Sequence, residues 1–387
     1  MSVPAPERRR VVLLGATGSI GRQACDVIGR YPERFELVGA VAGSDVTGLG
    51  AVAERFGVRR VAVVDPAPGT SLPEGWGSGV EAACEVASME CDVVCVAITG
   101  AAALRPALAA LDAGRLAAIA TKEVLVMAGD LVRERAARSG SRIIPVDSEH
   151  SALWQCLRGE TRESVARVVL TASGGPFRER AAGTFASITP AEALNHPTWR
   201  MGPKVTIDSA TMMNKGLEVI EAHFLFDLDY ARVEVAIHPD SLVHSYVEFC
   251  DGAIVAQLGV PDMRVPISLA LSDGERLPGV GPSLDLREAP PLRLLPVDPQ
   301  RFPAVGLART AGERGGLAPC VLNAANEVAV AAFLDGRCRF DEIVPLVAAT
   351  VDAAPSDSAT SLDAILEADA WARREASSRL GREVLAG

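Results

Sequence analysis

Short apolar runs that alternate with amphipathic stretches dominate residues 10–147. The runs R-V-V-L-L-G, R-V-A-V-V-D and D-V-V-C-V-A-I are separated by helical segments such as R-Q-A-C-D-V-I. Strands that are buried on both faces give continuous apolar runs, and helices between them connect parallel strands. The pattern therefore predicts an α/β region with a parallel sheet covered by helices on both faces.

A glycine-rich turn, G-A-T-G-S-I-G, follows the first apolar run and opens a helix. Its glycines are Gly15, Gly18 and Gly21. Glycine permits a tight turn and lets backbone N–H groups approach a pyrophosphate at the amino end of a helix. In this strand–turn–helix context the motif predicts dinucleotide binding in a Rossmann-like domain, and the alternative is a plain glycine turn. The residues expected around the phosphates are Thr17, Ser19 and Ile20.

The second strand ends in A-G-S-D, residues 42–45. An acid at this position normally holds the ribose 2′-hydroxyl and repels a 2′-phosphate, so Asp45 favours NAD. Ser44 could instead accept a 2′-phosphate, and these residues alone leave the choice of cofactor open. Thr99, Gly100 and the segment T-K-E at 121–123 are also expected at the carboxyl edge of the sheet, where such sheets bind ligands.

Two acids, Asp147 and Glu149, stand two residues apart in P-V-D-S-E-H, directly after the apolar run R-I-I-P-V. At the exit of a strand this spacing directs both side chains to the same side. Two ionised carboxylates so close repel, so a cation between them is expected. A divalent metal with oxygen ligands fits, with Glu218 as the third ligand. The alternative is a solvated acidic turn that caps the next helix.

The rest of the chain changes character after residue 147. Runs such as V-E-V-A-I-H-P, and H-S-Y-V-E-F-C with D-G after it, predict an antiparallel or mixed sheet with helices, and many prolines mark residues 277–303 as a linker. Long helical patterns follow. The predicted fold is α/β with a Rossmann-like N-terminal domain (1–147), a central α+β catalytic domain (148–276), the linker (277–303) and a small C-terminal helical domain (304–387).

Three polar segments of the central region are candidate site elements. S-G-G-P-F at 173–177 is either an anion-binding turn or a glycine hairpin. H-P-T-W-R-M-G-P at 196–203 is either a substrate lid or a loop packed on its own domain. In N-K-G-L-E, Lys215 and Glu218 share a helix face, and the alternative role is a surface salt bridge. Asn214 and Gly216 are poor interior helix residues and indicate a turn there.

Bulk properties narrow the class of partner and compartment. A net charge of −11 and a pI of about 5.1 argue against a broad nucleic-acid surface. No apolar run reaches the ~20 residues of a membrane span. The eight cysteines show no zinc-ligand spacing and fit a reducing compartment, so a cytoplasmic location is expected.

Taken in order, these segments resemble the 1-deoxy-D-xylulose 5-phosphate reductoisomerase family from Val11 to about Phe340. The most specific pieces are G-A-T-G-S-I-G, P-V-D-S-E-H, S-G-G-P-F, H-P-T-W-x-M-G, D-S-A-T-M-M-N-K-G-L-E, P-D-M-R and L-N-A-A-N-E. Several motifs in the same order and spacing are far more specific than any one of them.

The resemblance implies roles residue by residue. The implied ligands of Mg²⁺ or Mn²⁺ are Asp147, Glu149 and Glu218, which with Lys122 form the catalytic group. The implied substrate-binding residues are Lys122, Ser148, Glu149, Ser173, His196, Trp199, Met201, Ser209, Asn214, Lys215 and Glu218, with Trp199 and Met201 in a closing flap. The implied NADPH-binding residues are Gly15, Thr17, Gly18, Ser19, Ile20, Gly43, Ser44, Asp45, Thr121, Glu123 and Gly202.

The implied reaction converts 1-deoxy-D-xylulose 5-phosphate and NADPH to 2-C-methyl-D-erythritol 4-phosphate, a step of non-mevalonate isoprenoid biosynthesis. The resemblance also implies a homodimer, with neither nucleic acid nor membrane as a partner. Three positions depart from the family pattern: Thr121 and Asp45 each replace a common Asn, and Asp240 replaces a common Gln. The first two leave the preference for NADPH over NADH less secure.

Two other functions fit parts of the sequence. An ordinary NAD(P)-dependent semialdehyde dehydrogenase would need no metal, so its activity would resist chelators. A non-catalytic dinucleotide sensor would leave the three acids and the Ser, Asn and Lys cluster without a role, and would show no turnover.

Overall fold

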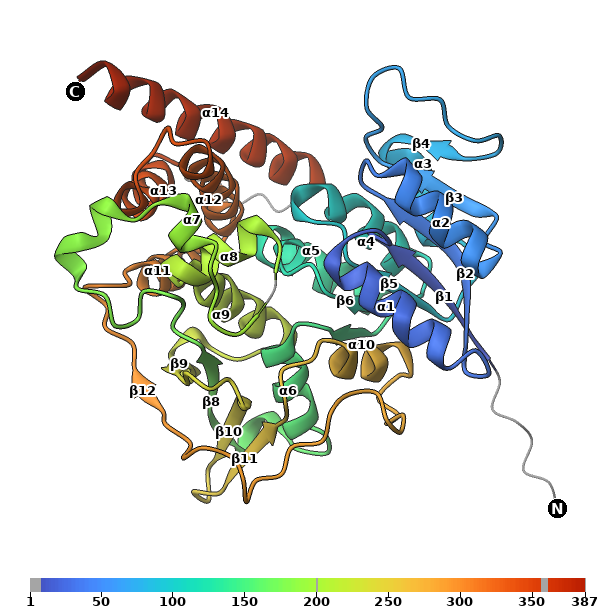
Figure 1. Ribbon diagram of the computed structural model, residues 1–387, viewed down its shortest axis with the longest axis horizontal. Coiled ribbons are helices and arrows are strands. Elements are labelled where there is room, and N and C mark those ends of the chain that lie inside the picture. Colours follow the sequence, from blue (N-terminus) through green and yellow to red (C-terminus); the bar gives the residue numbers. More distant parts are fainter. Residues whose placement is uncertain (1–7, 200, 356–360, 387) are drawn as a thin grey trace. The chain divides into compact units, whose positions relative to one another are not determined.

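The computed structural model describes residues 8–199, 201–355 and 361–386. The chain forms two compact units (Figure 1). Unit 1 holds the residues up to Val124 together with Val132–Trp154 and Asp262–Ser283. Unit 2 holds Leu125–Leu131, Gln155–Pro261 and the residues from Leu284 onward.

Unit 1 is built on a parallel sheet of seven strands in the order β4-β3-β2-β1-β5-β6-β7. The order reverses between β1 and β5, which makes this the switch point of a doubly wound sheet. The strands are β1 (Arg9–Leu14), β2 (Phe35–Ala42), β3 (Arg60–Val63), β4 (Gly77–Ser78), β5 (Val93–Val96), β6 (Leu116–Ile119) and β7 (Ile143–Pro145). The helices that accompany them are α1 (Ser19–Arg30), α2 (Val46–Phe56), α3 (Gly79–Ser88), η1 (Gly100–Ala103), α4 (Leu104–Asp112), α5 (Glu123–Ser139), α6 (Ser148–Cys156) and α10 (Arg264–Leu271).

Both faces of this sheet are covered, as the continuous apolar runs predict. Val11 and Leu13 of β1 belong to the buried cluster that includes residues of α1, α2 and α10. On the opposite face Val12 lies near Gly39, where Val86 of α3 also packs. Because alternate residues of one strand are buried on opposite sides, β1 has no polar face. The predicted Rossmann-like domain is confirmed.

Unit 2 contains a mixed sheet of five strands in the order β11-β10-β8-β9-β12. β8 and β9 are parallel, and the other pairs are antiparallel. The predicted D-G turn joins β10 to β11, with Gly252 at φ +87°. The strands are β8 (Val165–Ala172), β9 (Val233–Ile237), β10 (Val243–Phe249), β11 (Ile254–Leu258) and β12 (Leu295–Pro296).

The helices of unit 2 pack around an aromatic cluster and around one another. Phe177 meets Phe340 edge-on at 5.2 Å, and Phe185, Phe302 and Phe333 complete the cluster. The helices are η2 (Arg162–Ser164), η3 (Ala182–Ser187), α7 (Pro190–Ala193), α8 (Pro203–Thr211), α9 (Met213–Phe226), η4 (Tyr230–Arg232), α11 (Ala304–Arg314), α12 (Ala318–Leu334), η5 (Phe340–Glu342), α13 (Ile343–Asp352) and α14 (Leu362–Ala386).

The two units that the residue contacts define have different boundaries from the domains predicted from the sequence. Residues 262–283, which include α10, group with unit 1, and β12 lies within the stretch 277–303 that was predicted as a linker. The three-domain division remains a prediction. All eight cysteines are free thiols. None of the helices in the described ranges has the length and apolar character of a membrane span.

Candidate active site

The glycine turn lies at the carboxyl end of β1, next to the switch point of the parallel sheet. Gly15 has φ +94°, and a Cβ there would lie 2.3 Å from the carbonyl oxygen of Ala97. A Cβ on Gly21 would lie 2.1 Å from the carbonyl oxygen of Gly15. Both positions therefore exclude every larger residue. Gly18 is the N-cap of α1 and brings no side-chain cap, so the amino end of this helix is left for a ligand.

Asp45 lies at the end of β2, where it caps α2. Its Oδ1 accepts a hydrogen bond from the backbone N–H of Gly48 at 2.8 Å. Gly43, Ser44 and Asp45 are all exposed. The structure thus places the A-G-S-D motif where a dinucleotide fold meets the adenosine ribose.

Lys122 and Asp147 bring the ends of β6 and β7 together. The ammonium of Lys122 is hydrogen-bonded to Oδ2 of Asp147, and the two side chains are 10% and 12% exposed. Thr121 is buried, and its hydroxyl donates to the carbonyl oxygen of Ile98 at 2.6 Å. The hydroxyl of Thr121 therefore fastens the segment after β6 to the segment after β5.

Asp147 and Glu149 come close together, but not for the reason predicted from a strand exit. β7 ends at Pro145 and α6 begins at Ser148, so Glu149 stands in the first turn of a helix. The backbone carbonyl of Asp147 accepts the N–H of Ser151, which makes Asp147 the N-cap of α6. Carboxylate oxygens of the two acids still lie within 4.8 Å of each other. The Ser148 hydroxyl donates to Glu149 at 2.5 Å. The capping alternative is therefore right about the backbone, and both acids are partly buried.

In unit 2, His196 joins two serines that are distant in the sequence. Its Nε2 lies 3.0 Å from Oγ of Ser173 and 3.1 Å from Oγ of Ser209. Ser173 follows β8, His196 follows α7, and Ser209 lies on α8. The two glycines after Ser173 both have positive φ, and no hairpin forms there. A Cβ on Gly175 would lie 2.7 Å from the carbonyl oxygen of Ser209, so glycine permits this approach.

The tautomer of His196 follows from its hydrogen bonds. Its Nδ1 lies 3.1 Å from the backbone N of Thr198 and 2.9 Å from that of Trp199. Because Nδ1 accepts from these N–H groups, the ring proton resides on Nε2 and points to the serines. Burial lowers the pKa of His196 to about 4. The ring is therefore neutral near pH 7 and donates from one nitrogen only.

Asn214, Lys215 and Glu218 form a second polar cluster on the first turns of α9. The ammonium of Lys215 pairs with Oε2 of Glu218, and the amide of Asn214 donates to Oε1 of the same carboxylate. Glu218 is only 1% exposed, so the alternative of a surface salt bridge is wrong. A buried pair of this kind costs much to desolvate and is weak evidence of a purely stabilising role.

The turn predicted at Asn214 and Gly216 lies further upstream. Met212, with φ +63°, separates α8 from α9, and both predicted turn residues are inside α9. Gly216 serves packing instead: a Cβ there would lie 2.7 Å from the Cβ of Ala308 on α11. The small residue lets two helices approach closely, a cause that the local sequence does not reveal.

A buried polar chain behind these clusters was not predicted. Asp208 on α8 pairs with Lys204 at 2.9 Å and accepts from the amide of Asn326 at 2.7 Å. Asn326 belongs to the L-N-A-A-N-E motif of α12. The motif therefore helps to fix α8, the helix that carries Ser209. An Asn in the middle of an apolar helix was the available signal.

The remaining predicted residues lie near the start of α8. Gly202 is its N-cap, Met201 precedes it, and the side chain of Trp199 is half-buried. Arg200, within the predicted flap, lies outside the described residues.

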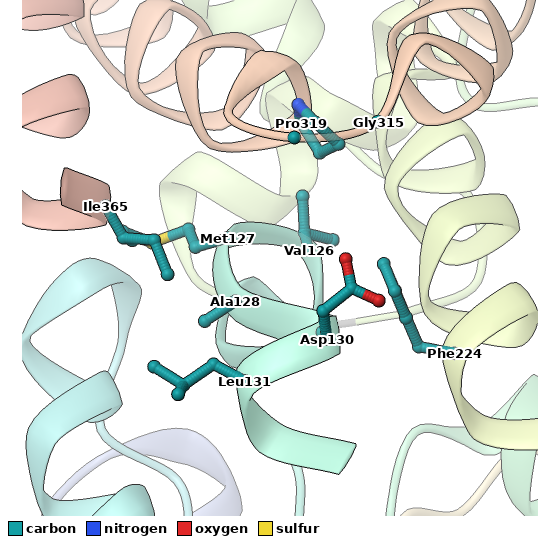
Figure 2. Close-up of a pocket in the computed structure, with 11 residues that line it drawn as sticks. Val126, Met127, Ala128, Asp130, Leu131, Phe224, Gly315, Pro319 and Ile365 are labelled. Carbon is teal, nitrogen blue, oxygen red and sulfur yellow. The ribbon is translucent and has the colours of Figure 1, made fainter. Parts of the chain in front are cut away.

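A small cavity in unit 2 contains none of the predicted site residues (Figure 2). It has a volume of about 20 Å³, room for a single water. It lies where α5 departs from helical geometry at Ala128, beside Phe224 and Pro319. A Cβ on Gly129 would lie 2.2 Å from the Phe224 ring, so the kink and the ring are packed tightly. We therefore interpret this cavity as a small gap in side-chain packing at the kink of α5.

The parallel sheet with a glycine turn at its switch point defines a dinucleotide-binding α/β protein. The second unit adds two polar clusters that could bind a ligand, a half-buried Ser–His–Ser cluster and an Asn–Lys–Glu cluster whose Lys215 and Glu218 are buried. Three family models match the chain. They are the 1-deoxy-D-xylulose 5-phosphate reductoisomerase model (residues 11–129), its C-terminal domain model (143–226) and the DXP reductoisomerase C-terminal domain model (258–375). The chain belongs to the 1-deoxy-D-xylulose 5-phosphate reductoisomerase family.

Individual relatives agree over nearly the full length. The 1-deoxy-D-xylulose 5-phosphate reductoisomerase of Thermomicrobium roseum is 48% identical over 97% of this chain and 99% of the relative. The solved reductoisomerase of Zymomonas mobilis in complex with NADPH is 40% identical, covers 97% of this chain and 99% of its own, and has a TM-score of 0.89. A solved DOX-P reductoisomerase in complex with NADPH, fosmidomycin and magnesium is 38% identical, covers 96% and 98%, and has a TM-score of 0.88.

Proposed function

We propose that this chain uses NADPH to convert 1-deoxy-D-xylulose 5-phosphate to 2-C-methyl-D-erythritol 4-phosphate in non-mevalonate isoprenoid biosynthesis. The match to reductoisomerases over 97% of the chain is the observation that carries the proposal. The polar clusters support it, because a simple dehydrogenase needs no set of buried acids and lysines in addition to its cofactor turn.

NADPH binds at the glycine turn of unit 1. The residues fit this group, because Gly15 and Gly21 leave no room for side chains and the amino end of α1 lacks a side-chain cap. Backbone N–H groups there favour a pyrophosphate. The cofactor-binding residues of the proposal are Gly15, Thr17, Gly18, Ser19, Ile20, Gly43, Ser44, Asp45, Thr121, Glu123 and Gly202. The group supplies a hydride, and the chain supplies its position.

Asp147, Glu149 and Glu218 hold one divalent metal, Mg²⁺ or Mn²⁺. Carboxylate oxygens are the ligands that these ions prefer. The donor set fits, since Asp147 and Glu218 are largely buried and each is paired with a lysine ammonium, which shows that a positive charge satisfies them. When bound, the metal polarises a substrate carbonyl as a Lewis acid.

The Ser–His–Ser cluster, with Asn214 and Lys215, anchors the substrate and its phosphate. The hydroxyls of Ser173 and Ser209 and the Nε2–H of His196 supply donors for phosphate oxygens. The buried Oδ1 of Asn214 has no hydrogen-bond partner in the described structure, and a substrate hydroxyl would satisfy it. Lys122 and Ser148 touch the substrate near the acids, and Trp199 and Met201 exclude water from it.

The assembly and compartment complete the proposal. The enzyme is a cytoplasmic homodimer. Its eight free thiols support a reducing compartment. The exposed Ile254 (60%) and Val255 (44%) on the edge strand β11 support association with a further chain. Light scattering on the purified protein tests the dimer.

The decisive experiment follows NADPH oxidation with 1-deoxy-D-xylulose 5-phosphate, with and without Mg²⁺ or Mn²⁺. We expect turnover only with metal, and inhibition by fosmidomycin. Turnover that survives a chelator would favour the semialdehyde dehydrogenase. Dinucleotide binding without turnover under every condition would favour the sensor.

A further inference from the structure

We infer that the adenosine end of the cofactor site accepts NADH nearly as well as NADPH, and that Asp45 sets this weak discrimination. The inference rests on the proposed cofactor site and concerns the 2′ position of the ribose, where the two dinucleotides differ. NADPH carries a phosphate dianion there and NADH a hydroxyl.

Two carboxylates flank the turn after β2. Asp45 follows Gly43 and Ser44, and only its Oδ1 is taken up, by the N–H of Gly48. Asp65, just beyond β3, donates its backbone N–H to the carbonyl oxygen of Gly43 at 2.8 Å. Both acids are exposed, and the motif they flank corresponds to the ribose position of a dinucleotide fold.

Cations are missing from the same place. The sequence has no lysine or arginine at 43–54 or 61–104. In the described part of the chain, no ion pair joins Asp45 or Asp65 to a basic side chain. Arg55 stands in the last turn of α2, at the opposite end from Asp45. Arg22 lies at the pyrophosphate turn, where its Nε donates to the carbonyl oxygen of Thr17 at 2.8 Å. Because NADH and NADPH both carry the pyrophosphate, Arg22 does not distinguish between them.

The electrostatics follow directly. A 2′-phosphate is normally accommodated by a nearby arginine, whereas an acid hydrogen-bonds a 2′-hydroxyl. Here the phosphate gains no ion pair and meets the like charge of Asp45, while Ser44 offers it one hydroxyl donor. The Oδ2 of Asp45 remains able to accept from a ribose hydroxyl. In a cationic site the 2′-phosphate makes NADPH bind more tightly than NADH. Here the missing ion pair and the charge of Asp45 offset that difference in affinity.

The test compares dissociation constants of NADPH and NADH by titration calorimetry on the metal-free protein, without substrate. We expect the two constants of the wild type to lie within about tenfold. Asp45→Asn keeps the cap on α2, because the amide oxygen still accepts from Gly48. It removes the charge, and should raise the preference for NADPH by about fivefold or more. Glu54→Gln, an exposed charge change near the other end of α2, is the matched control and should leave the ratio unchanged.

Each outcome decides the inference. A wild-type preference for NADPH above tenfold overturns it, and so does an Asp45→Asn protein whose ratio equals that of the wild type. If the protein binds NADPH but not NADH, the inference fails and the proposed function remains intact. Binding of neither dinucleotide contradicts the cofactor site itself and hence the proposed function. Ratios of kcat/KM with the two cofactors should follow the binding ratios.

Discussion

The glycine turn of unit 1 and the polar clusters of unit 2 make their sites in different ways. In the turn, the backbone forms the site, and Gly15 and Gly21 act through the absence of a side chain. In the clusters, the side chains of Ser173, His196 and Ser209 meet from a strand exit, a loop and a helix. A backbone site depends on local conformation, whereas a side-chain site depends on how separate elements pack.

The difference has a consequence for substitution. A change in the turn should damage the fold of unit 1 and cofactor binding together, because one conformation serves both. A change in a polar cluster should remove a chemical group and leave the elements in place. Four predictions probe this contrast, from the largest expected effect to the smallest.

Glu218→Gln should separate chemistry from cofactor binding. The substitution removes the charge that pairs with Lys215 and one proposed metal ligand. We expect turnover to fall by about 100-fold or more, with the dissociation constant of NADPH unchanged. Steady-state kinetics and calorimetry measure the two quantities. Equal losses in both would show that Glu218 acts on the whole fold and would break the contrast.

Gly21→Ala should affect binding and stability at once. Its Cβ would lie 2.1 Å from backbone oxygen, so α1 or the turn must move. We expect a loss of about 1–3 kcal/mol in the free energy of unfolding and NADPH binding weaker by about tenfold or more. Urea unfolding and calorimetry check this.

Gly50→Ala is the matched control for Gly21. It lies inside α2, where the nearest atom to a new Cβ is 3.9 Å away, on Trp76. Since alanine favours a helix over glycine, this variant should be neutral or more stable by about 0.5–1 kcal/mol. If both variants behave alike, steric exclusion at the turn is not what Gly21 provides.

Two substitutions at His196 should divide its two hydrogen-bonding roles. His196→Asn keeps an acceptor for the N–H groups of Thr198 and Trp199 but no longer reaches the serines. We expect KM for the ketose phosphate to rise by about tenfold, the effect of one lost charge-assisted hydrogen bond, with a smaller change in kcat.

His196→Gln does the reverse, since its longer amide reaches Ser173 and Ser209 while the local turn is lost. We expect kcat to fall more than KM rises, because the segment that follows is no longer held. Identical kinetic profiles for the two variants would count against separate roles for the two ring nitrogens.

Acid should weaken unit 2 through its buried histidines, with the smallest effect. Burial lowers the pKa of His196 and of His244 to about 4, below the ordinary 6.5. Between these values the unfolded chain binds more protons than the folded one, so the free energy of unfolding falls as pH drops from about 6.5 to 4. The slope for one histidine cannot exceed about 1.4 kcal/mol per pH unit.

His196→Asn isolates this contribution from that of the carboxylates. Its stability should depend less steeply on pH than that of the wild type in the window from 6.5 to 4. Above pH 7 the two curves should run parallel. Urea unfolding at several pH values gives both slopes, and equal slopes throughout would contradict the role of His196.

The sequence predicts the turn better than the clusters. Gly15, Gly18 and Gly21 act within seven residues, directly after an apolar strand, so the local pattern contains the cause. The same kind of reasoning gave a wrong prediction of a turn at Gly216. Glycine is needed there because Ala308 on α11 approaches closely. Glu149 was expected on a strand exit and stands on α6, since the helix begins as soon as Asp147 can cap it.

By itself, the amino-acid sequence determined the parallel sheet, the cofactor turn, the D-G hairpin and the identity of the polar residues. These depend on apolar periodicity, on positive φ and on which residue types the chain contains. Only the tertiary structure decided which polar atoms meet. The meeting of Ser173, His196 and Ser209, the burial of Glu218 and the support of α8 by Asn326 depend on elements that are separate in the sequence. Packing, which local patterns do not encode, brings them together.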